Sequence, residues 1–319
     1  MQDGGVDQQS DAAVSWLLSS AEPAIRLMTR RDVLGADVAS DPGEVLAGPA
    51  VTALLSGQQP DGGFGVHAYR KWTGAHWRLI SLAELEVPAH ESRCVAAAAT
   101  VLAYLDPSRK RVAVIDGLAR RCASIEGNAL AVWCRLGLAE DPRVQAVADA
   151  LIGWQWPDGG WNCDLRATGR RSSFHESLGP AWGLHEYWLA TGDVAARHAA
   201  ERAAELFLEH RLFRSLSTGE VINSVWLAPH YPPYWHYDTL QALLILSRMG
   251  KARDRRTSDA LDELERRRLP DGRWRAGGCW WKPVPSTLTP EVVDWGRSGP
   301  NEMITLNALR VLRAADRMS

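Results

Sequence analysis

The stretch Gln155-Trp156-Pro157-Asp158-Gly159-Gly160-Trp161-Asn162-Cys163-Asp164 decides the fold, because the chain repeats it. A near copy, Gln59-Pro60-Asp61-Gly62-Gly63-Phe64, precedes it, and a weaker one, Pro270-Asp271-Gly272-Arg273-Trp274, follows it. The copies are about 100 residues apart, which is room for two helical hairpins each. An active-site loop rarely occurs three times in one chain, whereas a scaffold element commonly does. We therefore interpret the stretch as part of an internal structural repeat.

The composition favours a globular protein without a charged partner. The 319 residues are 46% hydrophobic, and the net charge of −2 comes from interspersed charges. Such a chain offers no basic field for nucleic acid or for an anionic membrane surface. We also expect no signal peptide, because the first residues lack a basic region followed by an apolar one, and no transmembrane segment, because no apolar run is long enough. We expect a cytoplasmic protein that binds no nucleic acid.

Helical periodicity dominates the sequence, and strand-like alternation is nearly absent. Asp41-Pro42 and Asp141-Pro142 are typical of a helix cap followed by a first-turn proline. The expected helices alternate between amphipathic and more apolar segments, and they cover 12–35 in two pieces, 43–58, 74–86, 92–105, 110–122, 126–138, 142–155, 174–191, 194–213, 235–249, 256–268 and 301–316.

The repeated hairpins must stack to bury their apolar faces, either as an open array or as a closed ring. The last segment, 300–313, reads like the apolar inner helices and lacks the polar outer face of a terminal cap. This favours a closed ring of hairpins over an open array.

The motif Gln-x-Pro-Asp-Gly-Gly-Trp resembles the QW repeat of the squalene–hopene and oxidosqualene cyclases, whose ring of hairpins is similar to that of protein prenyltransferase β subunits. The resemblance covers roughly residues 43–316. It implies a single-domain, all-α protein: an α/α toroid over 43–319 with a helical segment, 1–42, packed on it. It also implies that Trp161, Trp274 and Phe64 are structural.

In such a toroid the inner helices present their N-termini at one mouth of a central cavity, where unpaired N–H groups and partial positive charge converge. Ionisable and aromatic side chains are frequent at these positions: His76, Trp77, Glu126, Asn128, His175, Glu176, Trp235, His236, Tyr237, Asp238, Asn301 and Glu302. Structural interpretations compete. Ser173 and Glu176 fit a capping box, Glu126 and Glu302 fit first-turn acids, and His76 and His175 fit buried core histidines.

The first functional hypothesis is an enzyme of specialised metabolism, in the lyase or isomerase class, that cyclises or isomerises a small apolar, isoprenoid-like or polycyclic molecule. Asp238 or Glu176 would act as acid or base, and His236 and His175 would orient or relay the proton. The Asp-x-Asp-Asp acid motif of such cyclases is missing. Substrate contacts would come from His76, Trp77, Trp182, Trp235, Tyr237, Asn301, Glu302 and Arg171, the last in a basic loop suited to a prenyl diphosphate.

The second hypothesis is a metal-dependent transferase or hydrolase. Prenyltransferase β subunits bind zinc through an Asp-x-Cys and a His, and His236 lies where that His would fall, although the Asp-x-Cys is not matched. Zinc or another divalent metal would be held by a subset of His236, Glu176, His175, Asp238 and Cys163, with Cys279 as an alternative. The Cys-His-Gly element of lanthionine-forming toroid cyclases is missing, and a protein without any cofactor stays open.

The third hypothesis is a non-catalytic binding module with a filled cavity. The other cysteines are expected to be buried small apolar residues, because five cysteines without a Cys-x-x-Cys pair suggest neither a disulfide framework nor a zinc finger. The sequence leaves the substrate and the oligomeric state open.

Overall fold

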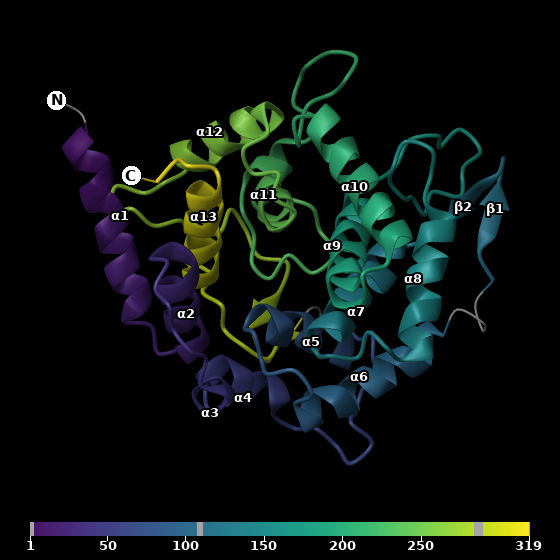
Figure 1. The fold of residues 1–319 in the computed structure, drawn as a ribbon, viewed down its shortest axis with the longest axis horizontal. Helices are drawn as coiled ribbons and strands as arrows, with labels where there is room; N and C mark the ends of the chain where they lie inside the picture. The colour runs from purple at the N-terminus through teal and green to yellow at the C-terminus, as the bar shows by residue number, and fades with distance from the viewer. Residues whose placement is uncertain (1–2, 107–110, 284–289, 319) are drawn as a thin grey trace. The chain divides into compact units, whose positions relative to one another are not determined.

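The computed structural model describes residues 3–106, 111–283 and 290–318, with side chains from residue 10 onward. These residues are mostly helical, as the sequence predicted (Figure 1). Internal contacts divide the chain into two compact units. Unit 1 comprises Met1–Leu54, Leu208–Pro233 and Asp238–Ser319, and unit 2 comprises Leu55–Phe207 and Tyr234–Tyr237. The sequence predicted a division into an N-terminal segment, 1–42, and a toroid, 43–319. The contact-based units do not test that division, which stays a prediction.

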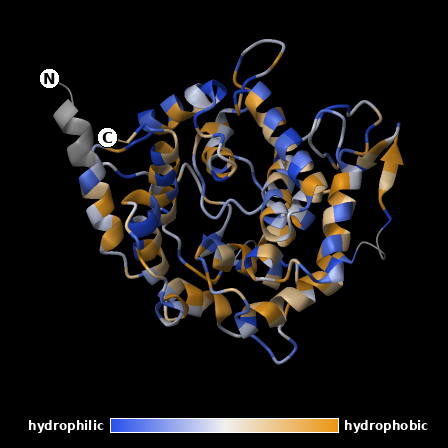
Figure 2. Cartoon of the chain, viewed as in Figure 1, coloured by the Kyte–Doolittle hydropathy of each residue, from blue (hydrophilic) through white to orange (hydrophobic). Residues whose placement is uncertain are grey.

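Unit 2 is built from helices of two kinds. Its central helices are buried on nearly all sides: α5 (Ala75–Glu84), α7 (Ala123–Arg135) and α9 (Phe174–Thr191). Its other helices are amphipathic: α6 (Ser92–Leu105), α8 (Pro142–Trp154) and α10 (Val194–Glu209), the last ending just beyond the unit. Figure 2 shows the hydrophobic residues along one side of α8, where Val144, Val147, Ala148 and Leu151 are buried at helical spacing.

Glycines bring α7 and α9 unusually close together. A Cβ added at Gly127 would collide with the backbone nitrogen of Pro180, and one added at Gly183 would collide with the carbonyl oxygen of Gly127. A Cβ at Gly179 would lie 2.8 Å from the Ser124 carbonyl oxygen. Because the contacts advance in the same order along both helices, α7 and α9 run in the same direction and begin side by side.

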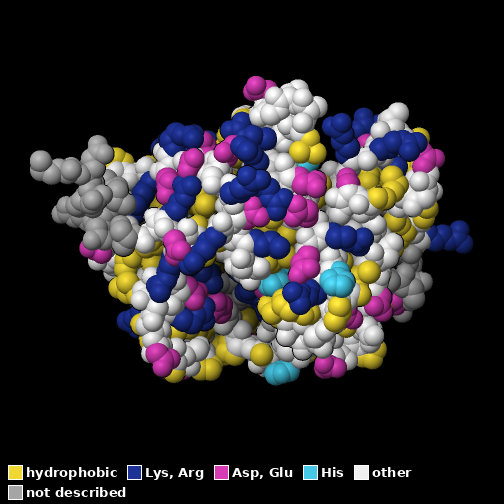
Figure 3. All heavy atoms as spheres, turned by 45° about the horizontal axis from the view of Figure 1, so that its top comes forward, with side chains coloured by type: hydrophobic (Ala, Val, Ile, Leu, Met, Phe, Trp, Pro, Cys, Tyr) yellow, Lys and Arg dark blue, Asp and Glu magenta, His cyan; other side chains and the backbone are white. Residues whose placement is uncertain are grey.

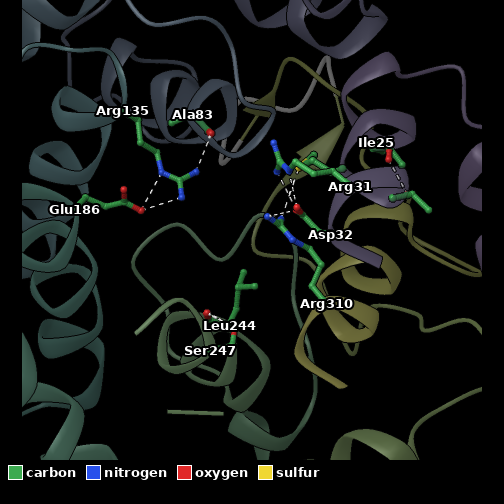
Figure 4. Close-up of polar contacts among 11 residues, drawn as sticks. Ile25, Arg31, Asp32, Ala83, Arg135, Glu186, Leu244, Ser247 and Arg310 are labelled. Atoms are coloured by element: carbon green, nitrogen blue, oxygen red, sulfur yellow. Dashed lines mark hydrogen bonds and ion pairs between the residues drawn. The ribbon is translucent and has the colours of Figure 1, made fainter. Parts of the chain in front are cut away.

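Arg135 fixes the other ends of the three central helices (Figure 4). Its Nε and Nη2 donate to Glu186 Oε1 in α9 at 3.0 and 2.8 Å, and its Nη1 donates to the Ala83 carbonyl in α5 at 3.2 Å. The guanidinium thus satisfies a C-terminal carbonyl of α5 and pairs with a carboxylate. α5, α7 and α9 therefore all end at the same side of unit 2.

Unit 1 collects the two ends of the chain. Its elements are α1 (Asp3–Leu18), α2 (Pro23–Met28), the π-helical turn η1 (Thr29–Val33), α3 (Pro42–Leu46), α4 (Pro49–Leu55), η3 (Ser224–Leu227), α11 (Thr239–Arg248), η4 (Arg255–Thr257), α12 (Ser258–Arg266) and α13 (Glu302–Ala314), with a short parallel pair of β3 (Lys282–Pro283) and β4 (Pro290–Glu291). Arg310 of α13 pairs with Asp32 of η1 at 2.7 Å, which joins the C-terminal helix to the N-terminal segment (Figure 4).

The helix predicted over 110–122 was wrong. β1 (Ala113–Ile115) and β2 (Leu118–Arg120) form an antiparallel hairpin there. Asp116 and Gly117 connect the strands with φ angles of 50° and 77°, the conformation that an Asp-Gly hairpin turn requires. The local turn signal and the Val-Ile content outweighed the helical spacing.

The predicted helix caps are confirmed at both Asp-Pro pairs. The side chain of Asp41 accepts a hydrogen bond from Gly43 N, and that of Asp141 accepts one from Arg143 N, each at 2.8 Å. The helix predicted over 43–58 is divided into α3 and α4, because Pro49 begins a new helix.

The repeated Pro-Asp-Gly loops make equivalent hydrogen bonds. Gln155 Nε2 donates to Gly159 O at 2.7 Å and to Ala199 O of α10 at 2.8 Å, so the loop ties α8 to α10. In the first copy Gln58, rather than Gln59, makes the same pair of bonds, to Gly62 and Arg93. The Trp161 indole is 1% exposed and donates to Leu151 O. This is the structural role expected for the loop.

We expect Gly127→Ala to lower the free energy of unfolding by about 1–3 kcal/mol, because the added methyl group must push α7 away from α9. Gly153 in α8 is the matched control, since a Cβ there meets open space. Gly153→Ala should raise the stability by about 0.5–1 kcal/mol, the ordinary helix preference of alanine over glycine. Urea denaturation of both variants measures the difference; equal effects would contradict the close contact.

Candidate functional site

Backbone pairing brings two cysteines of unit 2 together. Arg120 at the end of β2 pairs with Asn162 as an isolated parallel bridge, and Arg121 N donates to Asn162 O at 3.0 Å. Two cysteines are therefore held close: Cys122, which follows Arg121 and is the N-cap of α7, and Cys163, which follows Asn162. Cys122 is exposed and Cys163 is half-buried.

The third member of the cluster, Glu176, comes from the first turn of α9. Its Oε2 accepts hydrogen bonds from Ser124 N at 3.0 Å and from Ser124 Oγ at 2.8 Å. The side chain thus satisfies an unpaired N–H at the start of α7 instead of its own helix start, and the Ser173 side chain makes no cap bond. The carboxylate is 8% exposed and can reach α7 because the glycine contacts hold the two helix starts together.

The geometry leaves Glu176 Oε1 facing the sulfurs. Cys163 Sγ lies 3.6 Å from this oxygen. One ligand atom from each of Cys122, Cys163 and Glu176 lies within 4.8 Å of the others, which is the spacing of a site that could hold a metal ion. We refer to these three side chains as the thiol–carboxylate cluster.

The pKa shifts within the cluster follow from crowding of acidic groups. A hydrogen bond with Cys163 is the main factor that lowers the Cys122 thiol pKa, and Arg121 also favours the thiolate. The same hydrogen bond, with burial and the Glu176 charge, raises the pKa of Cys163. Burial raises the pKa of Glu176 despite the two bonds from Ser124. Negative charge on these three groups is therefore mutually unfavourable, and a divalent cation would offset it.

Residues around the cluster are aromatic and charged. Arg121 Nε donates to Glu126 Oε1 at 3.0 Å, so the only first-turn acid of α7 already has a cationic partner. Burial raises the pKa of the Tyr69 phenol, and the charges of Tyr104, Cys122 and Glu176 raise it further, which places this phenol within electrostatic reach of the cluster. The Tyr69 ring also lies 6.1 Å from Tyr104.

The predicted histidines lie apart from the thiols. His175 Nδ1 accepts a hydrogen bond from Tyr237 N at 2.8 Å, and burial lowers its pKa. The His175 and His236 rings are 6.3 Å apart, and His236 stacks on Trp235 at 3.9 Å. Although His175 and Glu176 are neighbours in sequence, only Glu176 joins the cluster.

The predicted substrate-binding residues of unit 2 are mostly packed. His76 is 1% exposed and Trp77 donates through Nε1 to Tyr69 O. Trp182 Nε1 donates to Glu186 Oε1, and Tyr237 packs edge-on against Phe174. Arg171 is exposed, with its backbone oxygen bound by Asn162 Nδ2.

Three predicted residues belong to unit 1. Asp238 is 1% exposed and caps α11: Oδ1 accepts from Gln241 N and Oδ2 from His230 N, both at 2.9 Å. Asn301 caps α13 by accepting from Ile304 N. Burial raises the pKa of Glu302, which is half-buried.

Of the metal ligands predicted from the sequence, the structure brings Cys163 and Glu176 together and adds Cys122, which the sequence reasoning treated as a buried apolar residue. The sequence reasoning missed Cys122 because it placed this residue at the end of a predicted helix, 110–122, and not at the start of α7. The Asp116-Gly117 turn, had it been read as a hairpin, would have placed Cys122 at the start of the next helix.

The chain matches no family model and no curated protein. Within the described residues no helix is long and apolar enough to cross a membrane. Figure 3 shows Lys and Arg side chains mixed with Asp and Glu on the face in view, without a large area of one sign.

We expect Cys122 to react with iodoacetamide faster and at lower pH than Cys279 in the metal-free protein, because hydrogen bonding lowers the pKa of Cys122 and burial raises that of Cys279. Cys163→Ala should move the midpoint of the Cys122 reaction to higher pH. Mass spectrometry of the labelled peptides gives both rates. An unchanged midpoint in Cys163→Ala would contradict the thiol–thiol hydrogen bond.

Burial lowers the pKa of His76 to about 3. Since the unfolded chain takes up this proton below pH 6.5 and the folded chain does not, acid favours unfolding. Wild-type stability should fall by about 2 kcal/mol from this residue between pH 6.5 and pH 5. His76→Leu should remove that part of the slope, whereas His198→Leu, an exposed histidine on α10, should not. Urea unfolding at both pH values tests the assignment.

Proposed function

We propose that this chain is a metal-dependent transferase or hydrolase that holds one zinc ion on Cys122, Cys163 and Glu176. The observation that supports the proposal is the convergence of two thiols and a carboxylate oxygen within 4.8 Å. Sulfur ligands favour zinc over magnesium or calcium, and three protein ligands are typical of catalytic zinc sites, which keep one position open.

The surroundings of the cluster fit a metal ligand set. Ser124 holds Glu176 Oε2 through two hydrogen bonds and leaves Oε1 directed at Cys163. Orientation of a ligating carboxylate by neighbouring donors is a common feature of zinc sites. The exposed side of Cys122 would leave the open position accessible from solvent.

A zinc ion at this site would lower the pKa of a bound water or substrate thiol and so supply a nucleophile at neutral pH. This chain's own groups would set the selectivity. Tyr69 and Tyr104 offer aromatic surfaces for an apolar substrate, and Arg121 offers a cation close to the cluster. We propose a small, largely apolar substrate, with a prenyl diphosphate as one candidate.

We also propose that residues 43–319 form an α/α toroid similar to those of the prenyltransferases and squalene cyclases. The common direction of α5, α7 and α9 and the equivalent hydrogen bonds of the Pro-Asp-Gly loops support this proposal.

A metal-free cyclase or isomerase is the second candidate. The raised pKa of Glu176 favours it, because burial of a carboxyl group favours its protonated form, which is the form that a general acid needs. In that case Glu176 would protonate the substrate and the two thiols would be passive.

We expect purified protein to bind about one zinc ion per chain through the cluster, and Cys122→Ser, Cys163→Ser or Glu176→Gln to weaken the affinity at least tenfold each. Cys279→Ser is the matched control and should bind zinc as the wild type does. Elemental analysis after removal and return of the metal gives the stoichiometry, and the charge-transfer absorption of a cobalt-substituted sample reports thiolate ligation.

The same samples separate the two candidates. Zinc binding that is equally strong in a Cys122→Ser/Cys163→Ser double variant would refute the metal site. An activity that survives chelation but is lost in Glu176→Gln would establish the acid-catalysed alternative.

A further inference from the structure

Unit 1 contains a cavity of about 540 Å³ that the zinc hypothesis does not use. Its walls come from α1, α2, α4, the segment 292–296 and the start of α13. The size is in the range of sites that bind drug-sized molecules. All of its described lining residues belong to unit 1.

Three carboxyl groups line this cavity: Glu22, Asp294 and Glu302. None of the other described lining residues is a lysine, arginine or histidine. The rest of the wall is largely apolar, and it includes the indole rings of Trp16 and Trp295. A low-polarity pocket with several acidic groups and no basic group on its wall favours a cationic ligand.

Glu22 is the strongest indication of a missing partner. It is 5% exposed, and although Oε2 accepts a hydrogen bond from Ala50 N at 2.8 Å, Oε1 is buried without a partner. Oε1 packs against Gly48, where a side chain would collide with it. A buried carboxylate oxygen without a donor is costly, and its uncompensated charge adds to the negative potential at this wall of the cavity.

Glu302 is a second carboxyl group on the cavity wall that favours a cationic ligand. Burial is the main factor that raises the pKa of both Glu22 and Glu302. The Glu302 charge raises the pKa of Glu22 further, whereas the N–H groups of Ala50 and Ala24 lower it, and the Ser20 side chain lowers the pKa of Glu302. Arg26 also lowers the pKa of Glu22, but its guanidinium is directed to the Ser20 carbonyl at 2.7 Å.

We propose that this cavity binds an organic ammonium ion, with the N–H groups donating to Glu22 and Glu302 and the apolar part lying between Trp16 and Trp295. A primary ammonium suits the site because it carries several donors on one nitrogen. The Arg273 guanidinium already lies over the Trp16 ring, 4.5 Å from its centroid, so the rest of the Trp16 ring and Trp295 would contact the hydrocarbon part of the ligand. The site is independent of the thiol–carboxylate cluster, which lies in unit 2.

The test uses the full chain and two probes of nearly the same shape, 4-phenylbutylammonium and 4-phenylbutan-1-ol. Isothermal titration calorimetry should show the ammonium binding at least tenfold more tightly than the alcohol. Glu22→Gln should weaken ammonium binding about tenfold and reduce the preference over the alcohol, because the charge is lost while the size is kept. Glu44→Gln, an exposed first-turn glutamate of α3 outside the cavity, is the control and should bind as the wild type does.

Equal affinity for the two probes, no heat of binding for the ammonium, or unchanged binding by Glu22→Gln would overturn the proposal. Ala53→Trp covers the case in which Glu22→Gln does not fold. Ala53 lines the cavity from α4, and an indole there should fill the space and abolish binding without removing either carboxyl group. Wild-type affinity in Ala53→Trp would also refute the site.

Discussion

The close approach of α7 and α9 through Gly127, Gly179 and Gly183 is the constraint on which unit 2 depends. With side chains at these positions the helix axes would separate, and Glu176 could no longer reach the first turn of α7. The same approach lets Arg135 bridge to Glu186 at the opposite end. The absence of side chains at these three glycines therefore determines both the packing of the central helices and the position of Glu176 in the candidate site.

Much of this architecture could be predicted from the sequence. The bounds of α9 and the caps at Asp41 and Asp141 follow from local signals, because cap residues and helical periodicity act within a few residues. The structural role of the Pro-Asp-Gly loops could be predicted for a similar reason: a repeated motif must solve the same local problem each time. Closure of the whole chain into a ring is a question of long-range arrangement and stays a proposal.

The candidate site was harder to predict, because its members meet through tertiary contacts. Glu176 has the spacing of a capping box with Ser173, yet its carboxylate bonds to Ser124, 52 residues away in the sequence. Cys122 reaches Cys163 only through the pairing of Arg120 with Asn162. Neither contact produces a periodic pattern in the sequence. The β1–β2 hairpin, which brings Cys122 to Cys163, was predicted as a helix because its hydrophobic residues have helical spacing.

The three groups of the cluster are attached to the fold in different ways. Both sulfurs are carried by segments that precede helices, a hairpin end and a loop, whereas the carboxylate stands on a helix whose position is locked by backbone contact. If the cluster holds a metal ion as proposed, its two sulfur positions can therefore change more freely than the carboxylate, and a change of ligand type there would change the metal preference.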